Sequence, residues 1–110
     1  MSQEQTSQTD VLRVEVHCSV SEAVVVLGGE FDMSGTGTFW ANVSEAIAAR
    51  PQSITVEAAR LEFIDSSGLL ALMRARDAAT EAGVAFRVRE ASPAFRRVVE
   101  LTGAEGLLPD

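Results

Sequence analysis

The segment LEFIDSSGLL, residues 61–70, joins an apolar extended run to the start of a helix. A helix start leaves several backbone N–H groups without partners inside the helix and carries the positive end of the helix dipole. Asp65 or a following serine can cap that end, and Gly68 permits close packing there. A phosphate on a serine would lie near the same N–H donors. The segment therefore predicts a strand-to-helix junction that either serves packing alone or also acts as a switch.

The helix after this junction, predicted over residues 68–82, has a broad apolar arc and a narrow polar stripe. Gly83 marks its end. Leu70 lies within the polar stripe, on the same side as Arg74 and close to the helix start. An exposed leucine in that place is compatible with a docking surface for a partner, although single exposed leucines are common.

The residues before the junction predict two strands, a helix and a third strand. Residues 11–18 alternate between apolar and polar, which is the period of a strand with one buried face. Residues 23–31 are apolar at both odd and even positions, which indicates a strand covered on both faces. These two strands are expected to form a hairpin. A helix up to Arg50 and a short strand at 54–58, followed by a polar link at 59–60, complete this part.

The residues after the central helix predict one more strand and one more helix. Residues 84–89 alternate as a strand, and Ser92-Pro93 begins a helix that ends at Gly103. The order β-β-α-β-α-β-α predicts a single α/β domain, in which helices pack against a mixed sheet of about four to five strands. We expect that domain to occupy residues 11–108, after a flexible leader over residues 1–10.

The composition is that of a protein that folds without disulfide bonds or a structural metal ion. The chain has 110 residues, of which 46% are hydrophobic. Cys18 is its only cysteine, which excludes a disulfide framework and a zinc site of the Cys/His type within one chain. Residues 1–10 lack the pattern of a signal peptide, and no apolar run reaches membrane-spanning length. We therefore expect a cytoplasmic protein without a membrane partner.

The charge pattern excludes several functions. The net charge is −7, and all nine basic residues are arginines. Nucleotide binding of the Gly-Lys-Ser/Thr type and Schiff-base catalysis both need a lysine. An acidic chain also argues against nucleic acid as a partner. A protein partner or a small ligand fits better, and we predict no cofactor and no metal.

Two kinds of catalytic site have simpler explanations in this sequence. A Ser-His-Asp hydrolase would have to use His17, the single histidine, which we place on the solvent face of the first strand. Ser66 also does not stand in a Gly-x-Ser-x-Gly motif. A metal site would need the acidic residues near the strand ends to cluster, but capping and solvation explain those residues equally well. They are Glu30, Asp32, Glu62 and Asp65.

Three blocks of the sequence resemble those of a known family. Residues 29–32, GEFD, resemble a Gly-Glu-Leu-Asp block at the end of a second strand, with Phe31 in place of the usual leucine. Residues 61–69, which contain FIDSSGL, resemble a phosphoacceptor loop. Residues 92–97 and 101–103 resemble a third helix. In order and spacing, these blocks resemble a STAS domain of the bacterial anti-sigma-factor antagonist type.

This resemblance implies a binding protein with no catalysis of its own. Such a protein, when unphosphorylated, binds an anti-sigma factor that is also a serine kinase, and thereby frees a sigma factor. Phosphorylation of Ser66 would end binding, and a serine phosphatase would restore it. Asp65 and Ser67 would be loop neighbours, with Asp32 at the adjacent strand end. The partner-binding surface predicted in this way comprises Asp32, Asp65, Ser66, Ser67, Gly68, Leu70 and Arg74.

Two other functions remain open on the sequence alone. A STAS subunit can act as a constitutive adaptor, for example in a lipid-transport or stress-signalling complex, and its binding would not depend on a phosphate. A serine hydrolase that uses Ser66 is the more remote alternative, because the sequence offers it no well-placed general base.

Overall fold

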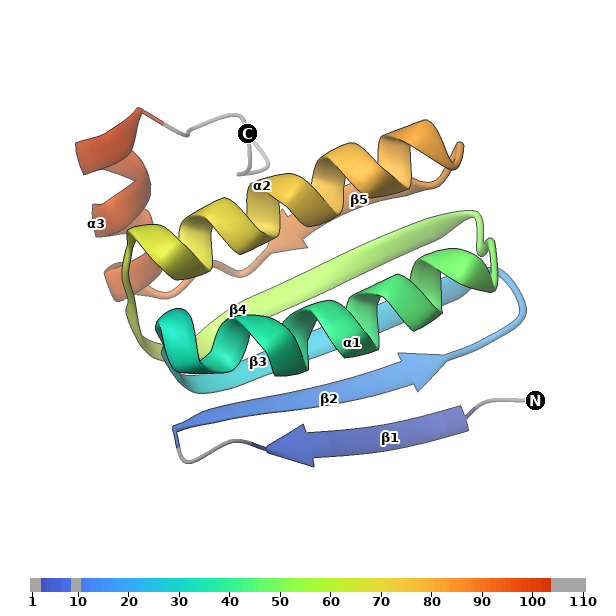
Figure 1. Ribbon diagram of the computed structural model, residues 1–110, viewed down its shortest axis with the longest axis horizontal. Helices are drawn as coiled ribbons and strands as arrows, with labels where there is room; N and C mark the ends of the chain where they lie inside the picture. Colours follow the sequence, from blue (N-terminus) through green and yellow to red (C-terminus); the bar gives the residue numbers. More distant parts are fainter. Residues whose placement is uncertain (1–2, 9–10, 104–110) are drawn as a thin grey trace.

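A computed structural model describes residues 3–8 and 11–103, in which a five-stranded mixed sheet carries helices on one side (Figure 1). The strands lie in the order β1-β2-β3-β4-β5; β2 runs antiparallel to its neighbours β1 and β3, and β3, β4 and β5 run parallel. The predicted α/β class and mixed sheet are confirmed. The elements are β1 (Gln3–Gln8), β2 (Leu12–Cys18), β3 (Glu22–Phe31), the 3-10 helix η1 (Met33–Gly35), α1 (Thr36–Ala48), β4 (Ser53–Ile64), α2 (Ser66–Glu81), β5 (Ala85–Arg89) and α3 (Pro93–Thr102).

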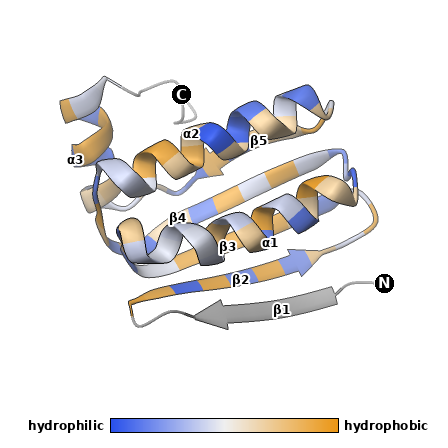
Figure 2. Ribbon diagram, viewed as in Figure 1, coloured by the Kyte–Doolittle hydropathy of each residue, from blue (hydrophilic) through white to orange (hydrophobic). Residues whose placement is uncertain are grey.

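The core lies between the sheet and the pair of helices α1 and α2, which run side by side across it (Figure 1). Hydrophobic and hydrophilic residues alternate along β2 and along residues 53–58 of β4 (Figure 2), so these segments turn one set of side chains toward the helices. The largest fully buried side chains are Phe31, Phe39, Phe95, Leu12, Leu27, Ile54, Leu72, Val14, Val25, Val43, Val56 and Val88.

Helix α3 begins where β5 leaves the sheet. β5 pairs with β4 only as far as Glu57, and the next backbone contact, 3.1 Å from Ser92 N to Ala58 O, joins β4 to the residue before α3. Ser92 caps the helix by accepting from Phe95 N at 3.1 Å, and Gly103 ends it in the left-handed conformation. Both helix signals in the sequence are confirmed.

The sheet face opposite α1 and α2, called the outer face below, is polar in the part of the chain that the structure describes. β3 was predicted to be covered on both faces, and this is wrong for its outer side, where Val24 and Val26 are half-buried. Their neighbours in the sheet register shield them instead: His17 and Thr55 flank Val24. Side chains from adjacent strands thus replace a second helical layer.

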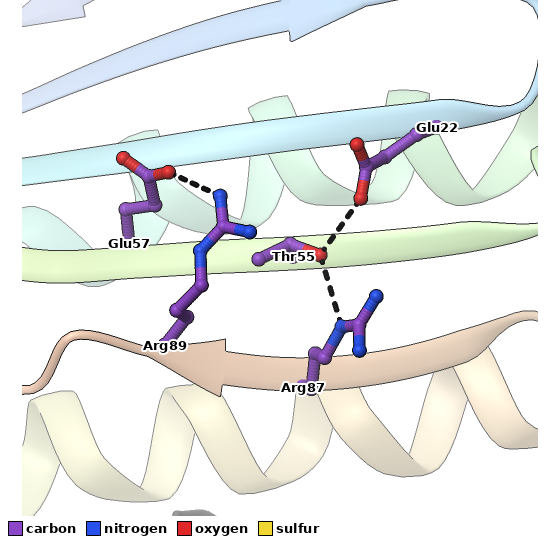
Figure 3. A network of polar contacts seen from close by, with 5 residues as sticks. All are labelled: Glu22, Thr55, Glu57, Arg87 and Arg89. Carbon is purple, nitrogen blue, oxygen red and sulfur yellow. Dashed lines mark hydrogen bonds and ion pairs between the residues drawn. The ribbon is translucent and has the colours of Figure 1, made fainter. Parts of the chain in front are cut away.

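Five polar residues on this outer face form a contact network across three strands (Figure 3). Thr55 Oγ1 donates to Glu22 Oε2 at 3.1 Å and accepts from Arg87 Nε at 3.4 Å. Arg89 forms an ion pair with Glu57. The hydrogen bonds and ion pair satisfy these groups in place, which suits a face open to solvent.

Two boundaries differ from the sequence prediction. Composition predicts a flexible leader over residues 1–10, whereas Gln3–Gln8 pair antiparallel with β2 as β1; backbone hydrogen bonding to an open strand edge does not depend on apolar side chains. The predicted polar link at 59–60 lies inside β4, which continues to Ile64 through register shifts against β3. The predicted domain end at Leu108 lies outside the described residues. No helix in the described ranges has the length and apolar character to cross a membrane.

Candidate functional site

The parallel strands β3 and β4 end side by side, and each is followed by an aspartate and then a helix. Phe31 is paired with Ile64 at the last position of the register. Asp65 N donates to Phe31 O at 3.2 Å, which fixes the start of α2 to the end of β3. The ends of parallel strands are common places for binding sites in open α/β sheets. The FIDSSGL segment lies at this edge.

Asp65 and Gly68 build the first turn of α2. The Asp65 side chain accepts from Gly68 N at 3.0 Å, so the aspartate, and neither serine, is the cap. A Cβ on Gly68 would lie 2.6 Å from Phe31 O and 2.9 Å from Ile64 Cγ1. The glycine therefore lets the helix start pack directly on the strand ends, as the sequence predicted. Because the aspartate caps, α2 begins at Ser66 and not at Gly68.

Asp32 holds the corresponding place after β3. Its Oδ1 accepts from Ser34 Oγ at 2.6 Å and from Ser34 N at 2.9 Å. The bond from the Ser34 hydroxyl is the largest cause that lowers the Asp32 pKa below its ordinary value of 3.8, followed by the bond from the Ser34 amide. Asp32 is thus a fixed negative charge at the strand edge, next to the start of α2.

The two serines differ in their surroundings. Ser66 is exposed as the first residue of α2, whereas Ser67 is half-buried. Neither hydroxyl makes a hydrogen bond to any residue that the structure describes. In a helix capped by serine, the serine oxygen accepts a hydrogen bond from a backbone N–H group. In α2 the Asp65 side chain accepts that bond instead. The Ser66 hydroxyl is consequently exposed, and no group in the described part of the chain engages it.

A groove of about 500 Å³ runs beside Ser67 between the first turns of α1 and α2. Its apolar walls come from three elements: Met33 of η1, Trp40 of α1 and Leu70 of α2, with exposures of 74%, 44% and 45%. The predicted exposure of Leu70 is confirmed. Arg74 is the charged residue in the lining, and it makes no ion pair with a described residue.

The predicted site residues separate into two groups. Ser67, Leu70 and Arg74 line this groove, which is called the α1/α2 groove below. The other predicted residues, Asp32, Asp65, Ser66 and Gly68, lie at the strand ends and the start of α2 next to it. Sequence reasoning did not assign Met33 or Trp40. Trp40 stands just beside the apolar stripe of its helix, and a large aromatic residue at the edge of such a stripe is a signal for partial exposure.

The structure separates the single histidine from Ser66. His17 is paired with Val24, near the start of β3, and the candidate site lies at the end of the same strand. At about 3.3 Å per residue this places His17 roughly 20 Å from the strand end. The described residues therefore supply no imidazole base for Ser66. The acidic residues near the strand ends do not gather either: the described part of the chain holds no group of three or more residues able to ligate a metal.

Comparison with known proteins gives one family and several similar structures. The family model described as "Mlab, STAS domain" matches residues 14–109. An anti-sigma factor antagonist from Mycobacterium paratuberculosis is 27% identical, with a TM-score of 0.75 over 94% of this chain and 87% of that one. The anti-sigma factor antagonist SpoIIAA in its unphosphorylated form is 22% identical, with a TM-score of 0.72 over 98% and 87%.

The Bacillus cell fate determinant SpoIIAA in its phosphorylated form is also similar, with 22% identity and a TM-score of 0.66 over 98% of this chain and 90% of that one. A search among curated proteins found no match. The family match extends over nearly the whole domain and agrees with the three sequence blocks, and the fold is shared with proteins of that kind. The chain therefore belongs to the STAS domain family.

Proposed function

We propose that the protein is a cytoplasmic anti-sigma factor antagonist. In its unphosphorylated form it binds an anti-sigma factor that is also a serine kinase, and a sigma factor is released. The observation that carries this proposal is the exposed Ser66 hydroxyl, which has no hydrogen-bond partner among the described residues and stands at the start of α2 beside an apolar groove. Similarity to an antagonist at 27% identity supports the same class of function.

The α1/α2 groove has the composition of a protein interface. Tryptophan, methionine and arginine are enriched in such interfaces, and the groove presents one of each together with Leu70. Apolar side chains from η1, α1 and α2 converge there, although the chain as a whole carries a charge of −7. We infer that the anti-sigma factor covers this groove and the adjoining start of α2.

A phosphate on Ser66 would oppose that contact electrostatically. It adds about −1.5 to −2 charges next to Asp65, at the edge of the sheet where Asp32 follows the adjacent strand. Burying such a dianion in an interface that accommodates a neutral hydroxyl costs several kcal/mol, and about 2.7 kcal/mol already corresponds to a hundredfold loss of affinity. Because the first turn of a helix attracts phosphate, the modified domain can remain folded. A serine phosphatase would then reset the switch.

The test is phosphorylation by the anti-sigma kinase with ATP, followed by peptide mass spectrometry. Ser67→Ala is the matched control, because it removes the neighbouring hydroxyl and leaves Ser66 in place. We expect phosphate on Ser66 in the wild type and in Ser67→Ala, and none in Ser66→Ala. We also expect Ser66→Asp to weaken binding of the kinase at least tenfold. Phosphate on Ser67 instead, or binding that does not respond to modification, would contradict the proposal.

A second function, a constitutive adaptor subunit of a lipid-transport or stress-signalling complex, is favoured by one finding. The matching family model is described as "Mlab, STAS domain" and not as an antagonist. An adaptor would use the same groove without a phosphate switch. In that case Ser66→Asp would leave partner affinity within about twofold of wild type, whereas Leu70→Ser would still reduce it.

A further inference from the structure

Two arginines flank a glycine in one row of the sheet, on the outer face. Arg13 of β2 is paired with Gly28 of β3, and Gly28 is paired with Arg60 of β4. Adjacent strands are about 4.8 Å apart, so the two arginine Cα atoms are about 10 Å apart across the glycine. Both guanidinium groups can therefore reach a group that lies over Gly28.

The three residues line one hollow of about 570 Å³, called the outer hollow below. A Cβ on Gly28 would lie 3.7 Å from Arg60 Cβ, which places the side chain of Arg60 on the same side of the sheet as the missing one of Gly28. That distance is ordinary contact, so packing does not demand a glycine here. At Gly29, in contrast, a Cβ would lie 2.2 Å from Val11 O. A larger residue at position 28 would fit the packing of the sheet. The glycine there therefore leaves room in the outer hollow for a ligand.

The arginines of the outer hollow are poorly neutralised. Arg60 makes no hydrogen bond or ion pair with any described residue, and Arg13 has one long contact, 3.7 Å from its Nε to Glu15 Oε2. Elsewhere on the outer face, arginines are held by partners: Arg87 bonds to Thr55, and Arg89 bonds to Glu57 (Figure 3). The outer hollow therefore contains one guanidinium group, that of Arg60, without an acceptor among the described residues, and a second, that of Arg13, with a single long contact.

Two further polar residues line the outer hollow. Ser92 is buried, and its Oγ accepts from Phe95 N while its own O–H has no acceptor among the described residues. Glu62 is exposed and contributes one carboxylate. The charged residues in the lining are thus two arginines and one glutamate, which gives the lining one net positive charge in a chain whose net charge is −7. Glu15, which contacts Arg13, lies outside this lining and lines an adjoining hollow together with Arg60, Glu57 and Glu90.

We propose that the outer hollow binds the phosphate group of a phosphorylated ligand between Arg13 and Arg60. A phosphate dianion accepts hydrogen bonds from two guanidinium groups at once, and arginine suits such a planar, bidentate contact. The volume accommodates more than a single phosphate, so the rest of the ligand has room beside it. The site is on the sheet face opposite the α1/α2 groove, and it does not depend on phosphorylation of Ser66.

Isothermal titration calorimetry of the full chain with sodium pyrophosphate at low ionic strength tests the site. Arg60→Gln and Arg13→Gln remove the proposed donors, and Gly28→Val fills the space while it keeps both charges. Arg87→Gln is the matched control, because it removes an equal charge from the same face. Circular dichroism verifies that each variant is folded. A parallel arm measures sedimentation with phosphatidylcholine vesicles that contain phosphatidylglycerol, which distinguishes a lipid headgroup from a soluble phosphate.

We expect pyrophosphate or the anionic vesicles to bind wild-type protein. Arg60→Gln, Arg13→Gln and Gly28→Val should each weaken that binding about tenfold or more, and Arg87→Gln less than about twofold. No binding in either arm up to about 10 mM ligand would overturn the proposal. An equal loss in Arg87→Gln would overturn it too, because it would show a diffuse charge effect. Neither result bears on the kinase assay, so the two proposals fail separately.

Discussion

At the scale of single residues, the site depends on the different surroundings of its glycines. Gly68 has no room for a Cβ, since the nearest atom would be the Phe31 carbonyl oxygen at 2.6 Å, whereas nothing lies within 4 Å of a Cβ on Gly37. Both glycines lie in the first turns of helices. The contrast gives a matched pair of substitutions with opposite expected effects.

Gly68→Ala should lower the free energy of unfolding by about 2 kcal/mol or more, because α2 must move away from the strand ends. Gly37→Ala should raise it by up to about 1 kcal/mol, since alanine favours the helix. Urea denaturation followed by circular dichroism measures both values. A Gly68→Ala protein as stable as wild type would contradict the close packing described for the start of α2.

The pH response of Asp32 is a second prediction about a residue. Hydrogen bonds from Ser34, the hydroxyl first, lower the Asp32 pKa below 3.8. A lowered pKa in the folded state stabilises the fold above the unfolded pKa, and that contribution is lost as pH falls through the folded pKa. Ser34→Ala should therefore raise the Asp32 pKa toward its ordinary value, as measured by carboxyl ¹³C chemical shifts. An unchanged titration would show that the hydroxyl bond is not the main cause.

At the scale of elements, the bond from Gly68 N to the Asp65 side chain holds the first turn of α2, where Ser66 lies. Asp65→Ala should cost about 1 kcal/mol of stability, because Gly68 N loses its acceptor, and Asp65→Asn should cost much less. Thermal unfolding measures the difference. If both variants lose the same stability, then the charge of Asp65, and not its capping bond, supports the helix start.

The sequence predicted most elements because their signals are local. Caps, glycine stops and the alternation of β2 all act within a few residues, and Ser92, Gly83 and Gly103 were interpreted correctly. Features that depend on neighbouring strands were missed. The outer side of β3 is shielded by residues of β2 and β4, and β1 is held by backbone pairing to β2. Neither arrangement can be recognised from the pattern of apolar residues within β3 or β1 alone.

At the scale of the whole molecule, the helices and the outer face of the sheet present two different surfaces. The sequence could place Leu70 and Arg74 on one side of a helix, because helical periodicity fixes their relative positions, and it placed Ser66 just before that helix. It could not add Met33 and Trp40, since their approach to α2 depends on how α1 crosses the sheet. The candidate site was therefore predictable only for the residues at the start of α2, the helix that begins with Ser66.

The α1/α2 groove should act as one binding unit. Trp40→Ala and Leu70→Ser remove side chains that are about half exposed, so each should lower the free energy of unfolding by about 1–3 kcal/mol and leave the protein folded. Each should weaken binding of the anti-sigma factor about tenfold or more, as measured by surface plasmon resonance. Val20→Ser is the control, because Val20 is exposed in the turn between β2 and β3, outside the groove. Unaltered affinity in both groove variants would place the partner elsewhere.

The central claim is that phosphate on Ser66 controls binding of the partner. Its most direct test is calorimetric titration of the anti-sigma factor with unphosphorylated protein and with protein stoichiometrically phosphorylated at Ser66. The account predicts that phosphorylation weakens the affinity about a hundredfold or more while the circular dichroism spectrum stays the same. Affinities that agree within about twofold would contradict it and would favour a constitutive adaptor.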